Sequence, residues 1–302
     1  DFAIEVAERY KADHRIEIVD QDDFDLVDKL AALYDEPYAD SSAMPTYRVC
    51  ELARKHVTVA LSGDGADELF AGYGRYRWHM NEEKVRQVLP LNLRKAVFKP
   101  LGALYPKMDW APRFLRAKTT FQSMAMDTVE GYHNSISILR QDERSKLFSK
   151  SYKQKLNGYT SLNVFRKYQN KVKTLDPMKT AQYLDMKTYL VGDILTKVDR
   201  ASMAHSLEVR VPFLDHKFVE WGFQVPSEIN LEQGVGKKSL KRAMEPHLPH
   251  DVLYRKKMGF SIPVAQWFRG PLKEKLYSGL LSEQMQECGY FDMEQLRKLI
   301  DQ

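Results

Sequence analysis

A short β-branched run followed directly by a glycine-rich acidic turn is the feature that most constrains the fold. Residues 57–61 read VTVAL, residues 62–65 read SGDG, and the helix-compatible ADELF follows. We predict a short buried strand over 57–61, a loop over 62–65 and a helix from about residue 66. This strand–loop–helix unit is typical of open parallel α/β sheets, in which ligands bind just beyond the carboxyl ends of the strands.

The turn carries groups suited to a nucleotide. Gly63 and Gly65 permit close backbone approach and positive φ, and amides at the start of the next helix suit an anion. Asp64 and Asp67 are three residues apart, so both carboxylates can face one site, which indicates Mg²⁺ held jointly by protein and nucleotide. A glycine-rich turn with a capping aspartate explains SGDG alone equally well. The turn matches neither the Walker A pattern nor GxGxxG.

The predicted secondary structure changes in character after residue 76. Before that point we predict a helix over 1–12, a strand at HRIEIV (14–19), two further helices, the second with Pro45 in its first turn, and the strand at VTVAL, an order typical of an open parallel sheet. From residue 77 onwards we predict helices broken by Pro and Gly, and no strand. The sequence therefore predicts an α/β core in 1–76 and a helical part in 77–302.

Composition excludes several classes of protein. The 302 residues are 43% hydrophobic and 29% charged, and their apolar runs are short, so we predict no membrane span. A net charge of +5 permits attraction to phosphates but does not indicate a nucleic-acid binder. The two cysteines, Cys50 and Cys288, argue against a disulfide framework and favour a reducing cytoplasm. The first residues read as a helix already under way, so we expect a further N-terminal portion.

Residues 61–76, LSGDGADELFAGYGRY, resemble the second signature of the asparagine synthetase B family, SG-(D/E)-G-x-D-E-(L/x)-F-x-G-Y. Three other segments are similar to motifs of that family and follow its order. They are DEPYADSSAMPTY (35–47), LTKVDRASMAHSLEVRVPFLD (195–215), which resembles the long helical signature, and RKKMGFSIP (255–263), which resembles the late lysine loop.

This resemblance implies an ATP-pyrophosphatase fold, with an adenine nucleotide alpha hydrolase-like parallel sheet. It implies adenylation of aspartate by ATP and Mg²⁺ to β-aspartyl-AMP and pyrophosphate, then amidation by ammonia to asparagine. In the family, an N-terminal glutaminase domain makes the ammonia from glutamine. Neither that domain nor the first phosphate loop, S-G-G-x-D-S, occurs in this sequence. We therefore expect a truncated synthetase domain that is inactive alone; a homodimer is compatible with the sequence.

The resemblance assigns roles to the residues of the turn. Ser62, Gly63 and Gly65 match positions that bind ATP, and Asp67 matches the metal-binding aspartate. Asp64 occupies the position tied to forming the acyl adenylate and to receiving a proton from ammonia. Many family members have Glu there.

Five other positions lie in or next to the two later motifs. Lys257 matches the late lysine that approaches the phosphates, although a solvated lysine is the ordinary reading of RKK. Asp193 is a catalytic candidate, and Lys197, Glu208 and Arg210 are either substrate-binding or structural. Glu208 and Arg210 can equally form a structural ion pair, and Asp193 and Lys197 a helix-surface pair at i and i+4.

Two alternatives stay open. A relative with the same chemistry would amidate another carboxylate, such as a sugar acid of a polysaccharide. A non-catalytic module that kept the fold would bind without turnover. Pyrophosphate release that depends on ATP and Mg²⁺ separates the enzymes from the module.

Overall fold

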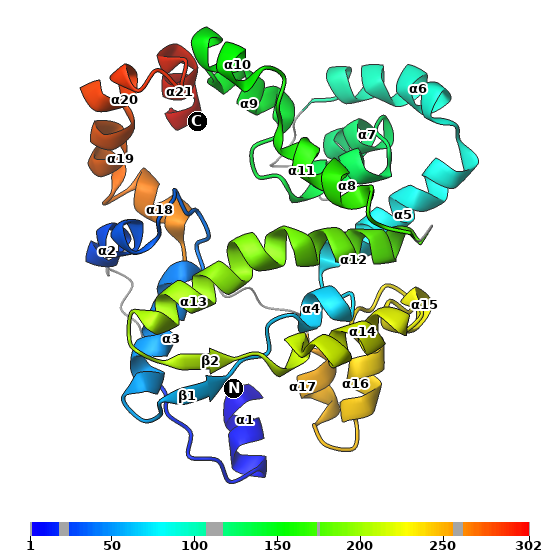
Figure 1. The fold of residues 1–302 in the computed structure, drawn as a ribbon, viewed down its shortest axis with the longest axis vertical. Helices are drawn as coiled ribbons and strands as arrows, with labels where there is room; N and C mark the ends of the chain where they lie inside the picture. The colour runs from blue at the N-terminus through cyan, green and yellow to red at the C-terminus, as the bar shows by residue number, and fades with distance from the viewer. Residues whose placement is uncertain (1, 18–23, 107–116, 174–175, 256–261, 302) are drawn as a thin grey trace. The chain divides into compact units, whose positions relative to one another are not determined.

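The computed structural model describes residues 2–17, 24–106, 117–173, 176–255 and 262–301 (Figure 1). They form two compact units, and each unit combines two stretches of the chain. The first comprises Asp1–Gly72 and Asp185–Val264, and the second comprises Tyr73–Leu184 and Ala265–Gln302. The division into domains at residue 76 remains a prediction.

The first unit mixes helices with a small sheet. Its elements are α1 (Phe2–Arg9), α2 (Asp25–Leu33), α3 (Ala43–Arg54), β1 (Val59–Leu61), α4 (Ala66–Leu69), the π-helix η2 (Leu190–Leu195), α13 (Thr196–Met203), β2 (Glu208–Arg210), the 3₁₀ helix η3 (Pro212–Leu214), α14 (His216–Gln224), α15 (Ser227–Asn230), α16 (Lys238–Met244) and α17 (His250–Tyr254). The predicted strand at 57–61, loop at 62–65 and helix from residue 66 are confirmed to within two residues.

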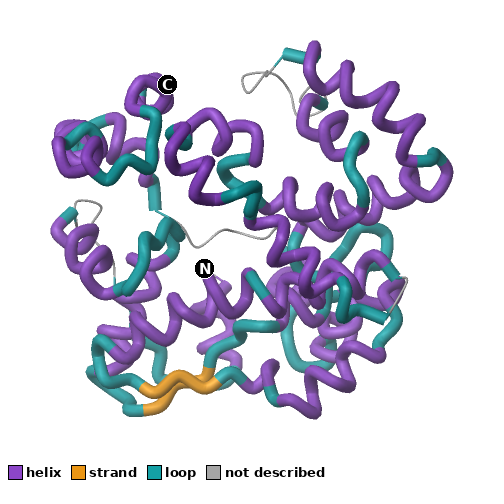
Figure 2. Tube along the Cα trace, turned by 45° about the horizontal axis from the view of Figure 1, so that its top comes forward, coloured by secondary structure: helices purple, strands orange, loops and turns teal. Residues whose placement is uncertain are grey.

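The sheet consists of two parallel strands in the part of the chain that the structure describes (Figure 2). Val59 lies opposite Glu208 and Leu61 opposite Arg210. The prediction of no strand beyond residue 77 is therefore wrong. The predicted burial of VTVAL is also wrong for these residues, since Leu61 is 75% exposed. Both faces of so small a sheet lie near solvent because few side chains cover it.

The expected strand over 14–19 is not formed in its described part. Residues 14–17 are irregular loop, and 18–19 lie outside the described residues. Strand propensity alone does not make a strand, because the extended chain needs a neighbour that accepts its backbone hydrogen bonds.

Two hydrophobic contacts organise the first unit. Helix α3 packs on α13 (Figure 1), where Tyr47, Cys50 and Ala201 are buried and the Tyr47 ring meets the His205 ring edge-on at 4.3 Å. A second cluster surrounds α4, directly after the SGDG turn. Its members are Ala66, Leu69, Phe70, Phe213, Phe218, Phe223 and Leu240. The segment that follows the turn is thus anchored in an apolar core.

The regular elements in the described residues of the second unit are helices, and an isolated antiparallel bridge joins Phe148 to Phe291. It contains α5 (Gly74–Val88), α6 (Leu91–Leu104), α7 (Lys118–Met124), α8 (Thr128–Ile136), α9 (Gln141–Leu147), α10 (Lys150–Leu156), α11 (Ser161–Gln169), most of α12 (Pro177–Lys187) and of α18 (Val264–Arg269), α19 (Lys273–Leu280), α20 (Glu283–Glu287) and α21 (Met293–Ile300). None of the described helices has the length and apolar character of a membrane span.

A buried arginine joins three helices of this unit. The Arg86 guanidinium lies 2.6 Å from Glu83 and 2.9 Å from Glu82 on α5, and it donates to the main-chain oxygen of Ser123 on α7. Gly131 on α8 makes room for it, because a Cβ there would lie 2.2 Å from Arg86 Nη2. The charge is buried but paired, which makes its burial tolerable.

Candidate active site

The SGDG turn directly follows the carboxyl end of β1, and a backbone hydrogen bond joins it to β2. The Ser62 amide donates to the main-chain oxygen of Arg210 at 2.8 Å, which extends the ladder one residue beyond β1. The Ser62 hydroxyl donates to Asp64 Oδ2 at 2.5 Å. The turn is therefore held both by backbone pairing and by its own side chains.

The two glycines of the turn do different things. Gly65 has φ +84°, and a Cβ there would lie 2.3 Å from Leu214 Cδ2 at the end of η3. Gly63 does not have positive φ, and a Cβ there would meet nothing within 4 Å. Packing thus explains why residue 65 is glycine. At Gly63, by contrast, the neighbouring space is unoccupied and would accommodate a side chain. The predicted contribution of helix amides is small, since α4 is a single turn.

Asp67 follows the turn and is met by a lysine from a distant part of the sequence. The Lys237 ammonium lies 3.0 Å from Asp67 Oδ2. The Lys237 amide donates to the main-chain oxygen of Phe70 at 2.8 Å, and Lys237 itself adopts φ +57°. Both main chain and side chain of Lys237 therefore bind the segment that follows the turn.

Two glycines allow this close approach. A Cβ on Gly72 would lie 2.0 Å from Asp67 Oδ1, and a Cβ on Gly236 would lie 2.1 Å from the main-chain oxygen of Ala71. Sequence reasoning missed Lys237. The signal that identifies it is a glycine–lysine pair directly before a helix, in GVGKKS.

Asp67 is the carboxylate at this site that would hold a metal ion. Among the described residues, no group of three or more His, Cys, Asp and Glu side chains is placed to hold a metal by itself. Mg²⁺ commonly takes only one or two carboxylates, with substrate phosphates and water completing its shell. Asp67 offers a single carboxylate whose Oδ2 already pairs with the Lys237 ammonium, so a metal there would take most of its shell from substrate phosphates and water.

Lys197 forms a buried ion pair, but not with Asp193. Its ammonium lies 2.6 Å from Asp40 Oδ2 and 2.7 Å from the Ser42 hydroxyl, and the two charged side chains are only 9% and 20% exposed. The expectation of a helix-surface pair with Asp193 is therefore wrong. Burial acts to raise the pKa of Asp40, but hydrogen bonds from Lys197 and Ser42 outweigh it and lower that pKa.

Asp193 instead bonds to Tyr38. The Tyr38 hydroxyl lies 2.6 Å from both Asp193 Oδ1 and the Asp193 main-chain oxygen, and the Tyr38 ring stacks on Tyr34 at 4.2 Å. Burial raises the pKa of the Asp193 carboxyl, and nearby Asp40 adds to the effect. Asp193 lies in the π-helix η2, a wide helical turn that is frequent at functional sites.

Glu208 and Arg210 lie on β2 and not on a helix. Arg210 Nε donates to Glu208 Oε1 at 2.7 Å, so the two side chains form an ion pair, one of the two roles left open by the sequence. Helix α13 ends at Met203, because Ser206 adopts φ +56° and the Leu207 amide turns back to the Ser202 oxygen. Both side chains are exposed, so this pair contributes little to stability.

The structure thus groups most of the predicted residues of the first unit in two places and leaves Glu208 and Arg210 as an exposed pair on β2. Ser62, Asp64, Gly65 and Asp67 gather at the end of β1, with Lys237 added. Asp193 and Lys197 gather around the loop at residues 38–42. Lys257 lies outside the described residues.

Comparison with known proteins establishes the family. The family model named Asparagine synthase matches residues 1–302, so the chain belongs to the asparagine synthase family. Asparagine synthetase [glutamine-hydrolyzing] 1 of Bacillus subtilis is 33% identical over 246 residues, which cover 82% of this chain and 37% of that protein.

Two further relatives show the spread of the similarity. A putative asparagine synthetase [glutamine-hydrolyzing] of Mycobacterium bovis is 34% identical over 291 residues, covering 94% of this chain and 42% of that protein. The amidase chry2 of Gibberella zeae is 25% identical over 288 residues, covering 88% and 41%. The chain therefore spans about two-fifths of the length of these curated relatives.

Proposed function

We propose that this chain is the synthetase portion of a glutamine-dependent asparagine synthetase with an ATP-pyrophosphatase fold. ATP adenylates the side-chain carboxyl of aspartate, giving β-aspartyl-AMP and pyrophosphate. Ammonia then displaces AMP, and asparagine is the product. Membership of the family and the names of the relatives support this reaction.

The observation that carries the proposal is the cluster at the end of β1. The Ser62–Gly65 turn is followed at once by a carboxylate, Asp67, and that carboxylate is met by the Lys237 ammonium. Adenylation brings a carboxylate and a triphosphate together, so their mutual repulsion must be neutralised. The proposal assigns this neutralisation to three neighbouring features. They are the turn, in which the space beside Gly63 admits the phosphates, the Asp67 carboxylate as a metal ligand, and the Lys237 ammonium.

Each group of the cluster has a role in the proposal. The Ser62 hydroxyl and the backbone around Gly63 and Gly65 contact ATP. Asp67 holds Mg²⁺, which supplies charge neutralisation at the phosphates. Lys237 stabilises the same phosphates. Asp64 orients the activated carboxyl and accepts a proton from the attacking ammonia.

Three residues outside the cluster complete the proposal. Lys257 adds a second cation at the phosphates. Asp193, held by Tyr38, faces the aspartate substrate. Lys197 acts by fixing the loop at Asp40 and Ser42, since those two residues occupy its ammonium.

The ammonia source and the setting are part of the same proposal. A glutaminase domain on the whole protein would deliver ammonia, and the two free cysteines fit the reducing cytoplasm. We expect the chain alone to be inactive, because its sequence lacks the S-G-G-x-D-S phosphate loop.

A second candidate is amidation of a different carboxylate, such as a sugar acid. The groups at the end of β1 are assigned to the phosphates and the reacting carboxyl and not to the rest of the acceptor, so this candidate uses the same cluster. An acceptor screen on the whole protein that contains this chain tests both, with AMP and pyrophosphate as readouts. Aspartate-dependent release of both products supports the asparagine synthetase. Release with another acid alone supports the second candidate, and no release with any acid overturns both in favour of a binding module.

A further inference from the structure

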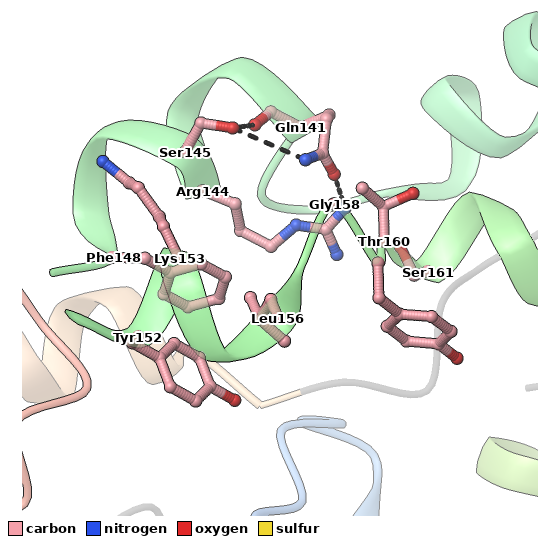
Figure 3. Close-up of a pocket in the computed structure, with 11 residues that line it drawn as sticks. Gln141, Arg144, Ser145, Phe148, Tyr152, Lys153, Leu156, Gly158, Thr160 and Ser161 are labelled. Atoms are coloured by element: carbon pink, nitrogen blue, oxygen red, sulfur yellow. Dashed lines mark hydrogen bonds between the residues drawn. The ribbon is translucent and has the colours of Figure 1, made fainter. Parts of the chain in front are cut away.

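The second unit contains a cavity that the proposed reaction does not use. Helices α9 and α10 and the segment 158–161 line an open pocket of about 300 Å³ (Figure 3). This is the lower end of the range of small-molecule sites, roughly 300–1,000 Å³. All of its lining residues belong to the second unit, whereas the cluster at the end of β1 belongs to the first.

The polar side of the cavity is cationic. Arg144 and Lys153 line it, and none of its lining residues is an aspartate or glutamate. The Arg144 guanidinium donates to the amide oxygen of Gln141 at 2.7 Å, a neutral partner that does not cancel its charge. Figure 3 shows Arg144 extending from α9 toward Thr160 and Ser161. A guanidinium in this setting favours an anionic ligand.

The opposite wall is apolar and aromatic. The Phe148 and Tyr152 rings meet edge-on at 5.1 Å, and Leu156 extends the wall along α10. Phe148 is also braced by Phe291, with ring centroids 6.3 Å apart. Because neighbouring rings hold Phe148, this wall is formed before any ligand binds. It suits a planar ring.

A buried histidine fixes a hydroxyl at the edge of the cavity. His133 Nε2 lies 2.8 Å from the Ser161 hydroxyl, and the His133 ring packs edge-on against Phe165 at 4.9 Å. Burial, helped by the charge of Arg144, lowers the pKa of His133, so the imidazole is neutral near pH 7. Ser161 is therefore an oriented polar group that accompanies the two cations.

We propose that this cavity binds a small aromatic anion, a planar ring that carries a carboxylate or phosphate group. The anionic group lies at Arg144 beside Ser161, and the ring lies against Phe148 and Tyr152. The site is additional to the proposed synthetase site and does not depend on it.

The test is a calorimetric titration of the chain with phenyl phosphate and with benzoate. At least one of them is expected to bind saturably at a single site. Inorganic phosphate, which lacks the ring, and benzyl alcohol, which lacks the charge, are each expected to bind at least about tenfold more weakly. Comparison of phenyl phosphate with benzoate identifies the preferred anionic group.

Variants locate the site. Arg144→Gln is expected to weaken binding by about tenfold or more, because it removes a charge-assisted contact. Lys155→Gln, which removes a charge from α10 outside the cavity, is expected to leave binding within about twofold. Lys237→Gln, at the other candidate site, is also expected to leave it unchanged. If Arg144→Gln does not fold by circular dichroism, Lys153→Gln replaces it, with an expected weakening of about two- to fivefold.

Several outcomes overturn the proposal. These are no saturable binding of either aromatic anion, equal binding of inorganic phosphate, unchanged binding in the Arg144 and Lys153 variants, or loss of binding in Lys237→Gln. The last outcome would assign the anion to the cluster at the end of β1.

Discussion

Lys197 reaches across 157 positions of sequence to place its ammonium 2.6 Å from the Asp40 carboxylate, while Asp193, four residues before it, bonds to Tyr38. The pair joins α13 to the loop before α3. Because Lys197 is buried, its charge requires a partner, and Asp40 supplies it.

Breaking this pair is expected to destabilise the chain strongly. Asp40→Asn leaves the Lys197 charge buried beside a neutral amide, and we expect a loss of about 3 kcal/mol in the free energy of unfolding. Urea unfolding measures it. Glu208→Gln, which breaks the exposed pair with Arg210, is the matched control and should cost at most about 1 kcal/mol. Equal losses in the two variants would show that Lys197 has no need of Asp40.

The pH dependence of stability should differ in sign between Asp40 and Asp193. The folded-state pKa of Asp40 lies below its ordinary value of 3.8, so its contribution is present above pH 3.8 and is lost as pH falls further. The pKa of Asp193 is raised, so its contribution is present below pH 3.8 and is lost as pH rises through the folded-state value.

Unfolding curves between about pH 3 and pH 7 test this difference. The deficit of Asp40→Asn should shrink toward low pH. Asp193→Asn keeps an acceptor for Tyr38 without the charge, so relative to the parent it should gain stability as pH rises. Parallel curves for the two variants would contradict the assignment.

Substitutions at the two glycines of the SGDG turn should have different effects, one on the stability of the fold and the other on nucleotide binding. Gly65→Ala puts a Cβ into Leu214 at a positive φ, and we expect a loss of about 1–3 kcal/mol in the free energy of unfolding. Gly63→Ala should change stability by less than about 0.5 kcal/mol. In the assembled enzyme it should weaken ATP binding, which nucleotide titration measures. A destabilised Gly63→Ala would remove the argument that this position is kept open for a ligand.

Asp67 and Lys237 should both matter for adenylation in the assembled enzyme. Asp67→Asn is expected to lower pyrophosphate release by about tenfold to a hundredfold and to raise the Mg²⁺ concentration required. Lys237→Gln should lower release by a similar factor, because it removes a charge at the phosphates. Lys217→Gln, an exposed lysine on α14, is the control. Normal release by Asp67→Asn at limiting Mg²⁺ would leave Asp67 as only the structural partner of Lys237.

Asp64 can be tested in two separate steps of the reaction. Asp64→Ala in the whole enzyme is expected to lower amide formation from free ammonia by about a hundredfold, as for a lost general base. Free ammonia bypasses the glutaminase, so the defect belongs to the synthetase site. An equal fall in pyrophosphate release would move the role to adenylation. Retention of both activities would leave Asp64 as the acceptor of the Ser62 hydroxyl alone.

Elements with strong local signals were predictable from sequence. The boundaries of β1, the turn and α4 follow from a β-branched run, two glycines and an apolar helix start, and each signal acts over a few residues. Strand β2 was missed because the three residues Glu208–Arg210 carry no strand pattern of their own. They are extended because β1 lies beside them.

The sequence by itself determined the family motifs, the strand–turn–helix unit that begins at residue 57 and the predominance of helix beyond residue 77, since these depend on local backbone preference. Only the tertiary structure decided which charges meet. It joined Lys237 to Asp67, Lys197 to Asp40 and Tyr38 to Asp193, and it left Glu208 and Arg210 exposed. The physical reason is that the Coulomb attraction between two charges is strongest where water is excluded. Packing between segments distant in sequence determines which charged groups lie in such places.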